Sequence, residues 1–212
     1  KQEWNHSFNL PFNLKTKEGA KGSGDNLVKF ERLLKLVGTD FFKNKTVLDI
    51  GCSDGYYSSE IAKLNAKNVI GIDIDIIRIK RANFINSILE LKNLSFQKKG
   101  FQDFNKQNKK FDIVIALGFI HRYPNIYEFF SNVSNMSNIL VLEFKTYNTH
   151  KPLLYWGGGH AKGTEKYNKL FFIPSILFIK EILTLNGFKR FTIKKDKLFG
   201  LKFKRTIIIA FK

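Results

Sequence analysis

A glycine-containing turn between a short apolar run and a helical segment is the part of this sequence best suited to binding a ligand. Within Val47–Gly55, Gly51 and Gly55 permit a tight turn and let a ligand approach the backbone without meeting a Cβ atom. Asp49 and Asp54 place negative charge there, which disfavours a phosphate and favours a cationic group. The spacing also differs from the G-x-G-x-x-G triplet that seats a pyrophosphate. These residues predict a binding turn for a ligand with cationic character.

A further acid, Asp73, closes the next apolar run, Asn68–Ile72. An acid about twenty residues after a glycine turn, at the end of a second parallel strand, is placed to accept hydrogen bonds from ribose hydroxyls. Either element alone is equally consistent with a purely structural turn. Together, in this order and at this spacing, they predict a nucleoside-binding edge of an α/β sheet.

The elements that must position these residues follow from periodicity. Short apolar runs alternate with segments of period 3.6, the pattern of an α/β fold. The expected strands cover 46–50, 68–72, 94–97, 111–117 and 139–143. The expected helices cover 25–37, 57–64, 76–91, 126–133 and 174–185. An antiparallel hairpin is expected from 188–194 and 201–211. We predict a single domain over 1–212, with an N-terminal arm at 1–24, a cofactor-binding half at 45–143, an irregular cap at 144–172 after the fifth strand, and a C-terminal helix and hairpin at 173–212.

Composition limits the possible partners and locations. The chain of 212 residues has 36 Lys and Arg against 18 Asp and Glu, a net charge of +18. This excess is consistent with an anionic ligand, and equally with an A/T-biased coding sequence, because Lys, Asn, Ile and Phe are abundant together. A single cysteine, Cys52, excludes an intramolecular disulfide and a multi-cysteine metal site. No apolar run reaches the roughly 18 residues of a membrane span, and no leader is recognisable, so we predict a cytoplasmic protein with no membrane contact.

The pattern D-x-G-x-x-x-G over Asp49–Gly55, followed by an acid at the end of the second strand, resembles the cofactor-binding half of class I S-adenosylmethionine (SAM)-dependent methyltransferases. The resemblance covers residues 45–143. It implies a Rossmann-like, seven-stranded, mostly parallel sheet with an antiparallel last strand and helices on both faces, and SAM as cofactor with S-adenosylhomocysteine (SAH) as product. It also implies a set of cofactor contacts. The methionine moiety is surrounded by Asp49, Gly51, Ser53 and Gly55, and the ribose contacts Asp73. The adenine is bordered by Ile74, Phe101 and Gln102, and the methyl-donor site is lined by Leu117 and Gly118.

A narrower resemblance concerns Ala116–Arg122 and Tyr167–Ser175, together with Trp4-x-His6 near the start of the chain. These segments are similar to the bacterial wobble-uridine tRNA carboxymethyltransferases and their relatives. The resemblance implies that His121 faces the transferred methyl group and that Arg122 contacts the substrate. A neutral histidine there would accept the proton of a hydroxyl nucleophile, so we predict His121 as the catalytic residue.

The cap is rich in aromatic and titratable side chains, which predicts a substrate-binding segment. The alternative is a loop whose aromatic side chains merely cover the sheet edge. We predict no metal site, because the two histidines of the cap and one nearby glutamate lack the spacing of a ligand cluster. With Arg122, the predicted substrate-binding residues are Tyr147, His150, Tyr155, Trp156, His160 and Tyr167.

The sequence therefore predicts a SAM-dependent methyltransferase that transfers a methyl group to an oxygen, or alternatively a nitrogen, of an anionic small molecule such as a phosphorylated or nucleotide-linked sugar. Lysine-rich surroundings with only six arginines favour such a substrate over tRNA, because sequence-reading of nucleic acid relies on arginine forks. Two alternatives remain: a tRNA wobble-uridine-modifying transferase, and a non-catalytic module that binds SAM or a nucleoside. The complete turn with Asp73 and His121 favours an enzyme over the non-catalytic module.

Overall fold

The computed structural model describes residues 4–16, 26–123, 125–158, 170–195 and 203–212. It divides into two compact units, Lys1–Ile113 and Val114–Lys212. The single domain over 1–212 stays a prediction. Two of the predicted substrate-binding residues, His160 and Tyr167, lie outside the described residues, as does Asp25, where the first helix is expected to begin.

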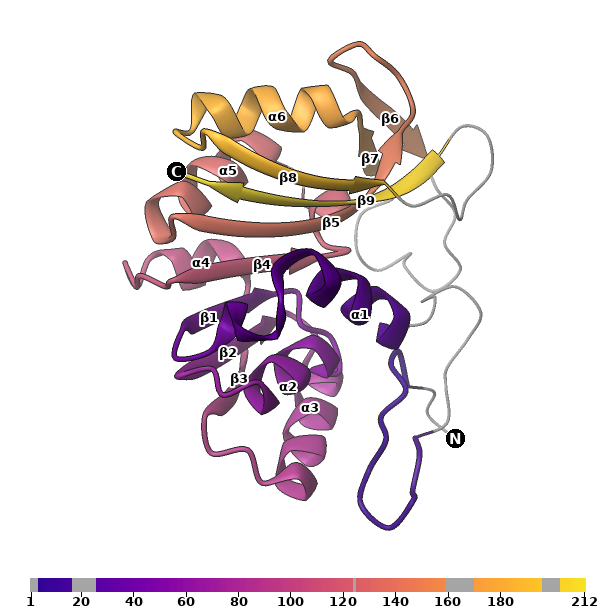
Figure 1. Cartoon of the computed structure of the whole chain (residues 1–212), viewed down its shortest axis with the longest axis vertical. Helices are drawn as coiled ribbons and strands as arrows, with labels where there is room; N and C mark the ends of the chain where they lie inside the picture. The colour runs from indigo at the N-terminus through magenta and orange to yellow at the C-terminus, as the bar shows by residue number, and fades with distance from the viewer. Residues whose placement is uncertain (1–3, 17–25, 124, 159–169, 196–202) are drawn as a thin grey trace. The chain divides into compact units, whose positions relative to one another are not determined.

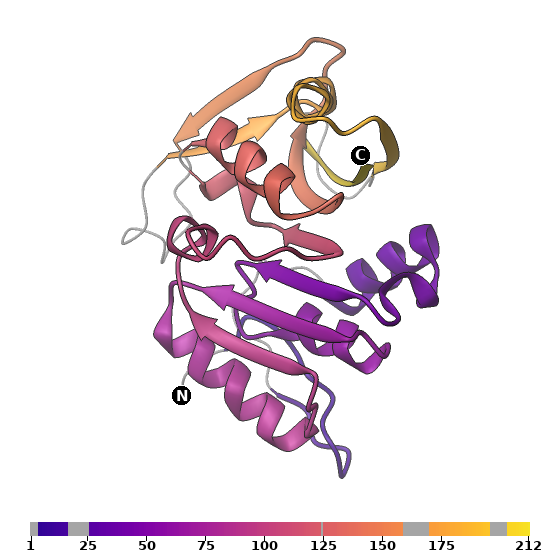
Figure 2. The ribbon, with the colours of Figure 1, turned by 90° about the vertical axis from the view of Figure 1, so that its left-hand side faces the viewer.

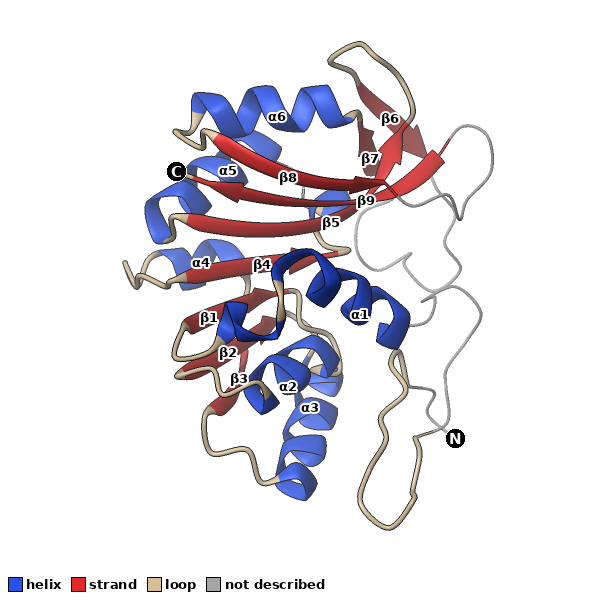
Figure 3. Ribbon diagram, viewed as in Figure 1, coloured by secondary structure: helices blue, strands red, loops and turns tan. Residues whose placement is uncertain are grey.

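A seven-stranded sheet has the strand order β3-β2-β1-β4-β5-β9-β8 (Figures 1 and 3). β1, β2 and β3 are parallel, and β9, the last strand of the chain, is antiparallel to both β5 and β8. The structure thus confirms the seven-stranded, mostly parallel sheet with an antiparallel last strand. The strands are β1 (Thr46–Ile50), β2 (Asn68–Asp73), β3 (Leu94–Lys98), β4 (Ile113–Leu117), β5 (Ile139–Tyr147), β8 (Arg190–Lys195) and β9 (Phe203–Phe211).

In the first unit, helices pack on strands whose central residues are apolar and buried. Val47, Leu48 and Val69 are fully buried, as expected of parallel strands covered by helices. Both α2 and α3 contact β2 and β3, and Figure 2 shows α3 running alongside these strands. Asp75 caps α3 by accepting hydrogen bonds from the backbone N–H groups of Ile77 and Arg78. The helices are α1 (Asn26–Val37), the 3₁₀ turn η1 (Thr39–Phe42), α2 (Tyr56–Lys63), α3 (Ile76–Leu89) and α4 (Phe101–Asn105).

In the second unit, β4, β5 and β9 contribute an apolar core in which Ile115, Leu142 and Ile208 are fully buried. Helices α5 and α6 contact each other. The remaining elements are the 3₁₀ turn η2 (Ile120–Arg122), α5 (Ile126–Met136), β6 (Leu154–Gly158), β7 (Leu170–Pro174) and α6 (Ile176–Leu185).

The predicted irregular cap at 144–172 is wrong in part. β5 continues to Tyr147 rather than ending at 143, and β6 pairs with β7 as a separate antiparallel two-stranded sheet (Figure 3). The backbone groups of β6 pair with those of β7, which is distant in sequence, so the periodicity of either segment alone does not reveal the pair. The expected start of the last helix also shifts, because Pro174 ends β7 and Ser175 caps α6 by accepting from Phe178 N.

Candidate active site

The glycine turn after β1 has the conformation that its sequence predicts. Gly51, Ser53 and Gly55 have φ of +74°, +54° and +86°. The backbone N–H groups of Gly51 and Cys52 both donate to the carbonyl of Ile72 on β2, at 2.8 and 3.0 Å. Left-handed backbone is unfavourable for a residue with a side chain, so the conformation at Ser53 requires support from its surroundings.

Gly55 is required by packing as well as by its backbone. A Cβ atom there would lie 2.5 Å from Cζ of Phe96 and 3.0 Å from Cβ of Ala82. The glycine therefore brings the start of α2 close to β3 and α3. Sequence reasoning explained Gly55 by the approach of a ligand, whereas its nearest neighbours are core side chains.

Asp73 provides part of the support for the turn. Its Oδ2 accepts a hydrogen bond from Ser53 N at 3.0 Å, and its Oδ1 accepts one from Asp75 N at 2.9 Å. An ionised carboxylate has about four acceptor positions, so two are used by the backbone and others remain. Asp73 is half-buried and lies at the end of β2, where ribose hydroxyls were expected.

Asp49 lies beneath the turn rather than on its surface. Its side chain is only 2% exposed and accepts a hydrogen bond from Ser58 Oγ at 2.6 Å. Burial raises the pKa of Asp49 to about 7, because removal from water disfavours the charged form. In this conformation Asp49 holds α2 to the end of β1 and has little surface to offer a ligand.

The residues predicted around the adenine differ in exposure. Ile74 is 54% exposed and presents apolar surface directly after Asp73, whereas the side chain of Phe101 is buried. Gln102 is exposed in the first turn of α4. A Cβ atom on Gly100 would lie 3.5 Å from Cγ2 of Ile74, so the segments after β2 and β3 meet here. Ile74 is the accessible apolar group of this set.

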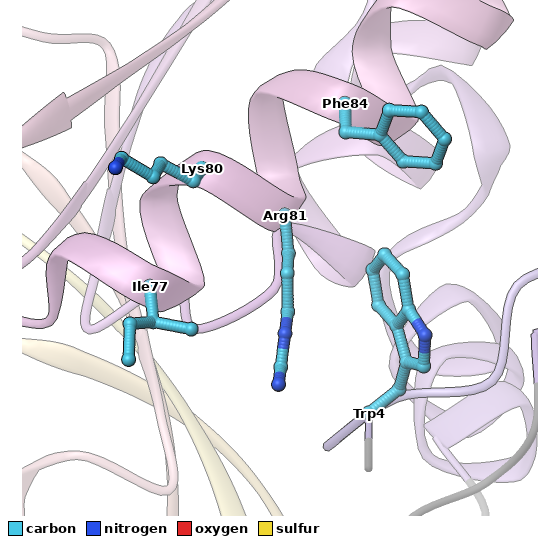
Figure 4. A pocket seen from close by; sticks show the side chains of 5 residues that line it. All are labelled: Trp4, Ile77, Lys80, Arg81 and Phe84. Carbon is cyan, nitrogen blue, oxygen red and sulfur yellow. The ribbon is translucent and has the colours of Figure 1, made fainter. Parts of the chain in front are cut away.

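The N-terminal arm also reaches the glycine turn, a contact that sequence reasoning missed. Asn5 N donates to Oδ2 of Asp54 at 2.6 Å, and the Trp4 ring lies 5.5 Å from the guanidinium carbon of Arg81 on α3. An open pocket of about 400 Å³ lies beside this contact, and Figure 4 shows Trp4 facing Arg81 across it. The Trp4-x-His6 motif marked this segment, but nothing in the sequence indicated what it touches. The pocket is lined by Trp4, Ile77, Lys80, Arg81 and Phe84.

In the second unit, His121 lies in η2, a few residues after Leu117 and Gly118 at the end of β4. Its Nε2 accepts a hydrogen bond from Arg122 Nε at 3.2 Å, which assigns the neutral ring with the proton on Nδ1. Burial lowers the pKa of His121 to about 3, and the positive charges of Arg122, Arg205 and Lys145 act in the same direction. The ring is therefore neutral at physiological pH.

An ion pair between Glu143 on β5 and Arg205 on β9 was not predicted. Both guanidinium nitrogens Nε and Nη2 of Arg205 donate to the carboxylate of Glu143, which is 6% exposed. A Cβ atom on Gly118 would lie 3.5 Å from Nη2 of Arg205, and Gly118 N donates to the carbonyl of Glu143 at 2.7 Å. An acid ending the apolar run at 139–143 was the available signal in the sequence. Its partner, 62 residues further on, had none.

The predicted substrate residues of the cap are only partly brought together. The rings of Tyr147 and Tyr155 stack, with centroids 5.5 Å apart and planes at 20°. His150 is exposed. Trp156 lies on β6, but its side chain is outside what the structure describes. Within the described ranges, no three His, Cys, Asp or Glu side chains gather in a way that could hold a metal ion, and no helix is long and apolar enough to cross a membrane.

Comparison with known sequences identifies relatives. A tRNA U34 carboxymethyltransferase of Campylobacter fetus subsp. fetus is 26% identical over 177 residues, which cover 81% of this chain and 60% of the relative. One from Nautilia profundicola is 30% identical over 83 residues, covering 39% of this chain and 27% of the relative. The chain thus spans at most about 60% of the length of these relatives.

Comparison with solved structures identifies the fold. The N-terminal domain of EvdMO1, solved with SAH bound, has a TM-score of 0.80 at 10% identity, covering 98% of this chain and 91% of that one. Magnesium protoporphyrin IX methyltransferase from Synechocystis PCC 6803, solved with bound SAM, has a TM-score of 0.62 at 18% identity, covering 92% and 86%. The family model described as "Methyltransferase domain" matches residues 41–197. This chain belongs to that methyltransferase-domain family and has the class I SAM-dependent methyltransferase fold.

Proposed function

We propose that the protein is a SAM-dependent methyltransferase that transfers a methyl group to an oxygen of an anionic small molecule, such as a phosphorylated or nucleotide-linked sugar. The observation that carries the cofactor assignment is Asp73, which fixes the left-handed turn through Ser53 N and keeps acceptor positions at the strand end. The family match over 41–197 supports the reaction class.

The described residues fit SAM by their chemistry. Acceptor positions on Asp73 suit ribose hydroxyls, and the exposed side chain of Ile74 suits the face of an adenine. Asp49 is buried and its pKa is raised to about 7, so it contributes little negative charge toward the sulfonium of SAM. When bound, SAM supplies a methyl group activated by that sulfonium.

His121 is suited to orienting a hydroxyl acceptor. The low pKa keeps the imidazole neutral. Because Nε2 accepts from Arg122 Nε, the other ring group is the Nδ1–H, which can align the acceptor oxygen as a hydrogen-bond donor. The same low pKa makes His121 a weak base, so its main contribution is to align the acceptor oxygen rather than to store its proton. Arg122 Nε holds the ring through Nε2 and thereby fixes its orientation.

The charges that lower the pKa of His121 also favour an anionic acceptor. Arg122, Arg205 and Lys145 carry three positive charges in the surroundings of the imidazole, against the negative charge of Glu143. Clustered cations raise the local concentration of an anion. The stacked rings of Tyr147 and Tyr155, in the same unit, provide an aromatic surface for the non-ionic part of such a molecule.

A tRNA substrate is the second candidate. It is favoured by the similarity to tRNA U34 carboxymethyltransferases over 81% of this chain and by the net charge of +18. Nucleic acid binding through several phosphates gives a steep dependence on salt, whereas a mono- or diphosphate gives a shallow one.

One experiment separates these possibilities. The protein is incubated with SAM labelled in its methyl group and with sugar phosphates, nucleotide sugars or total tRNA. Label is then measured in the acid-precipitable fraction and, after chromatographic separation from unreacted SAM, in the acid-soluble fraction. Label in a small molecule, with a shallow salt dependence, supports the proposal. Label in RNA with saturable tRNA binding favours the second candidate. Binding of SAH by calorimetry without transfer to any acceptor favours a non-catalytic module, and failure to bind SAH refutes the cofactor assignment.

A further inference from the structure

Three side chains form a hydrogen-bonded triangle between the N-terminal arm, the glycine turn and α3. Oδ1 of Asn5 accepts from the two terminal guanidinium nitrogens of Arg78, Nη1 at 3.0 Å and Nη2 at 3.1 Å, and from Ser53 Oγ at 3.0 Å. The amide is assigned this orientation because its oxygen then faces only donors. Arg78 Nη1 in turn donates to Ser53 Oγ at 3.1 Å. Each side of the triangle is therefore a hydrogen bond, and one of its three corners is Ser53, the residue at φ +54°.

Further contacts fix the arm on the glycine turn, on α3 and on the start of α2. Asn5 N donates to Asp54, and Arg81 pairs with Asp54 at 3.8 Å while lying against the Trp4 ring. His6 is 9% exposed and packs on the rings of Tyr56 and Tyr57 at the start of α2. Burial lowers the pKa of His6 to about 3, and Arg78 contributes to this, so the arm is docked with a neutral histidine.

We infer that Asn5 is a positioning residue for the cofactor, acting through Ser53 and Arg78 to keep the glycine turn in its binding conformation. This inference rests on the proposed function. A serine with left-handed backbone is unfavourable by itself and persists only where several surrounding contacts hold it in that conformation. Asp73 holds the backbone of Ser53, and Asn5 with Arg78 holds its side chain. Without Asn5 the competent turn is less populated, and the apparent affinity for cofactor falls in proportion.

The acceptor chemistry of the triangle makes the test specific. Because every partner donates to Oδ1, Asn5→Asp keeps the acceptor and its shape, whereas Asn5→Ala removes it. Loss of a hydrogen bond to a charged group predicts about a tenfold higher dissociation constant for SAH in Asn5→Ala, measured by calorimetry. Asn5→Asp is expected to restore the affinity to within about threefold of wild type. Asn9→Ala, at an exposed asparagine of the same arm, is the matched control and is expected to bind like wild type.

A second readout follows the arm directly. Trp4 and Trp156 are the two tryptophans of the chain, so a Trp156→Phe background leaves Trp4 as the reporter. If arm docking strengthens cofactor binding, cofactor binding must strengthen arm docking by the same factor. Addition of SAH should therefore protect Trp4 emission from acrylamide quenching, and this protection should be lost in Asn5→Ala.

The outcomes separate the inference from the proposed function. Wild-type protein that does not bind SAH counts against the proposed function itself. Wild-type binding with equal affinity in Asn5→Ala overturns the inference alone, as does an Asn5→Asp variant as weak as Asn5→Ala. If Asn5→Ala does not fold, Trp4 quenching in the Trp156→Phe protein decides, because a Trp4 that does not respond to SAH overturns the coupling.

Discussion

Replacement of Gly55 by alanine tests the packing at the glycine turn. The new Cβ atom would stand 2.5 and 2.8 Å from two atoms of the Phe96 ring and 3.0 Å from Cβ of Ala82. Phe96 is 9% exposed, so its ring has little room to move away. The substitution also forces an L residue to φ +86°.

Gly38→Ala separates the cost of the left-handed backbone from the cost of overpacking. Gly38 has φ +83°, but a Cβ atom there would meet nothing within 4 Å, so alanine at this position experiences only the backbone term. That term is about 1–2 kcal/mol, partly offset by the lower entropy of the unfolded chain, which leaves about 1 kcal/mol. Overpacking adds about 1–3 kcal/mol, so Gly55→Ala is expected to lower the free energy of unfolding by about 2–4 kcal/mol.

Urea unfolding of both variants measures these values. Phe96→Leu in the Gly55→Ala background should recover about 1 kcal/mol relative to additivity, because the smaller side chain relieves the contact. A Gly55→Ala variant no less stable than Gly38→Ala would show that the turn does not pack on Phe96 as described. If Phe96→Leu and Gly55→Ala have additive effects on the free energy of unfolding, the strain in Gly55→Ala does not come from the contact with Phe96.

Three further predictions concern the ionisable residues of the site. Asp73→Ala should raise the dissociation constant for SAH at least tenfold by calorimetry, since a charged acceptor for ribose and for Ser53 N is lost; wild-type affinity would remove Asp73 from the cofactor site. His121→Ala should keep SAH affinity within about threefold while lowering turnover about a hundredfold in the labelled-methyl assay, and a matching loss of SAH affinity would reassign His121 to the cofactor pocket. Asp49 binds its proton more tightly in the folded state, with a pKa of about 7 against 3.8, so stability falls as pH rises between these values by about 4 kcal/mol. Asp49→Asn should remove this slope in urea unfolding from pH 4 to 8, and an unchanged slope would show that Asp49 is not its source.

Part of the site could be predicted from the sequence because its residues are close together in the chain. The strand, turn and helix around Gly51 form one continuous segment, and their type depends on neighbouring residues. Asp73 was equally accessible, since a parallel strand order places the ends of β1 and β2 at one edge of the sheet. His121, shortly after the end of β4, was predicted instead from the resemblance to known methyltransferases, and its role stays a prediction.

The missed contacts are all between residues distant in the chain. Asn5 meets Ser53 across 48 positions, and Glu143 meets Arg205 across 62. The pairing of β6 with β7 has the same origin. No periodicity or spacing indicates such a partner, because it depends on how separate elements pack.

The sequence by itself determined the alternation of strands and helices, the glycine turn and the acid that closes the second strand, because backbone propensity and apolar periodicity act within a few residues. Only the tertiary structure decided which side chains surround these elements. It buried Asp49 under the turn, gave Gly55 a packing role, and placed three cations where they lower the pKa of His121. Burial and charge proximity depend on atoms brought together from distant segments, so they arise only when the chain has folded.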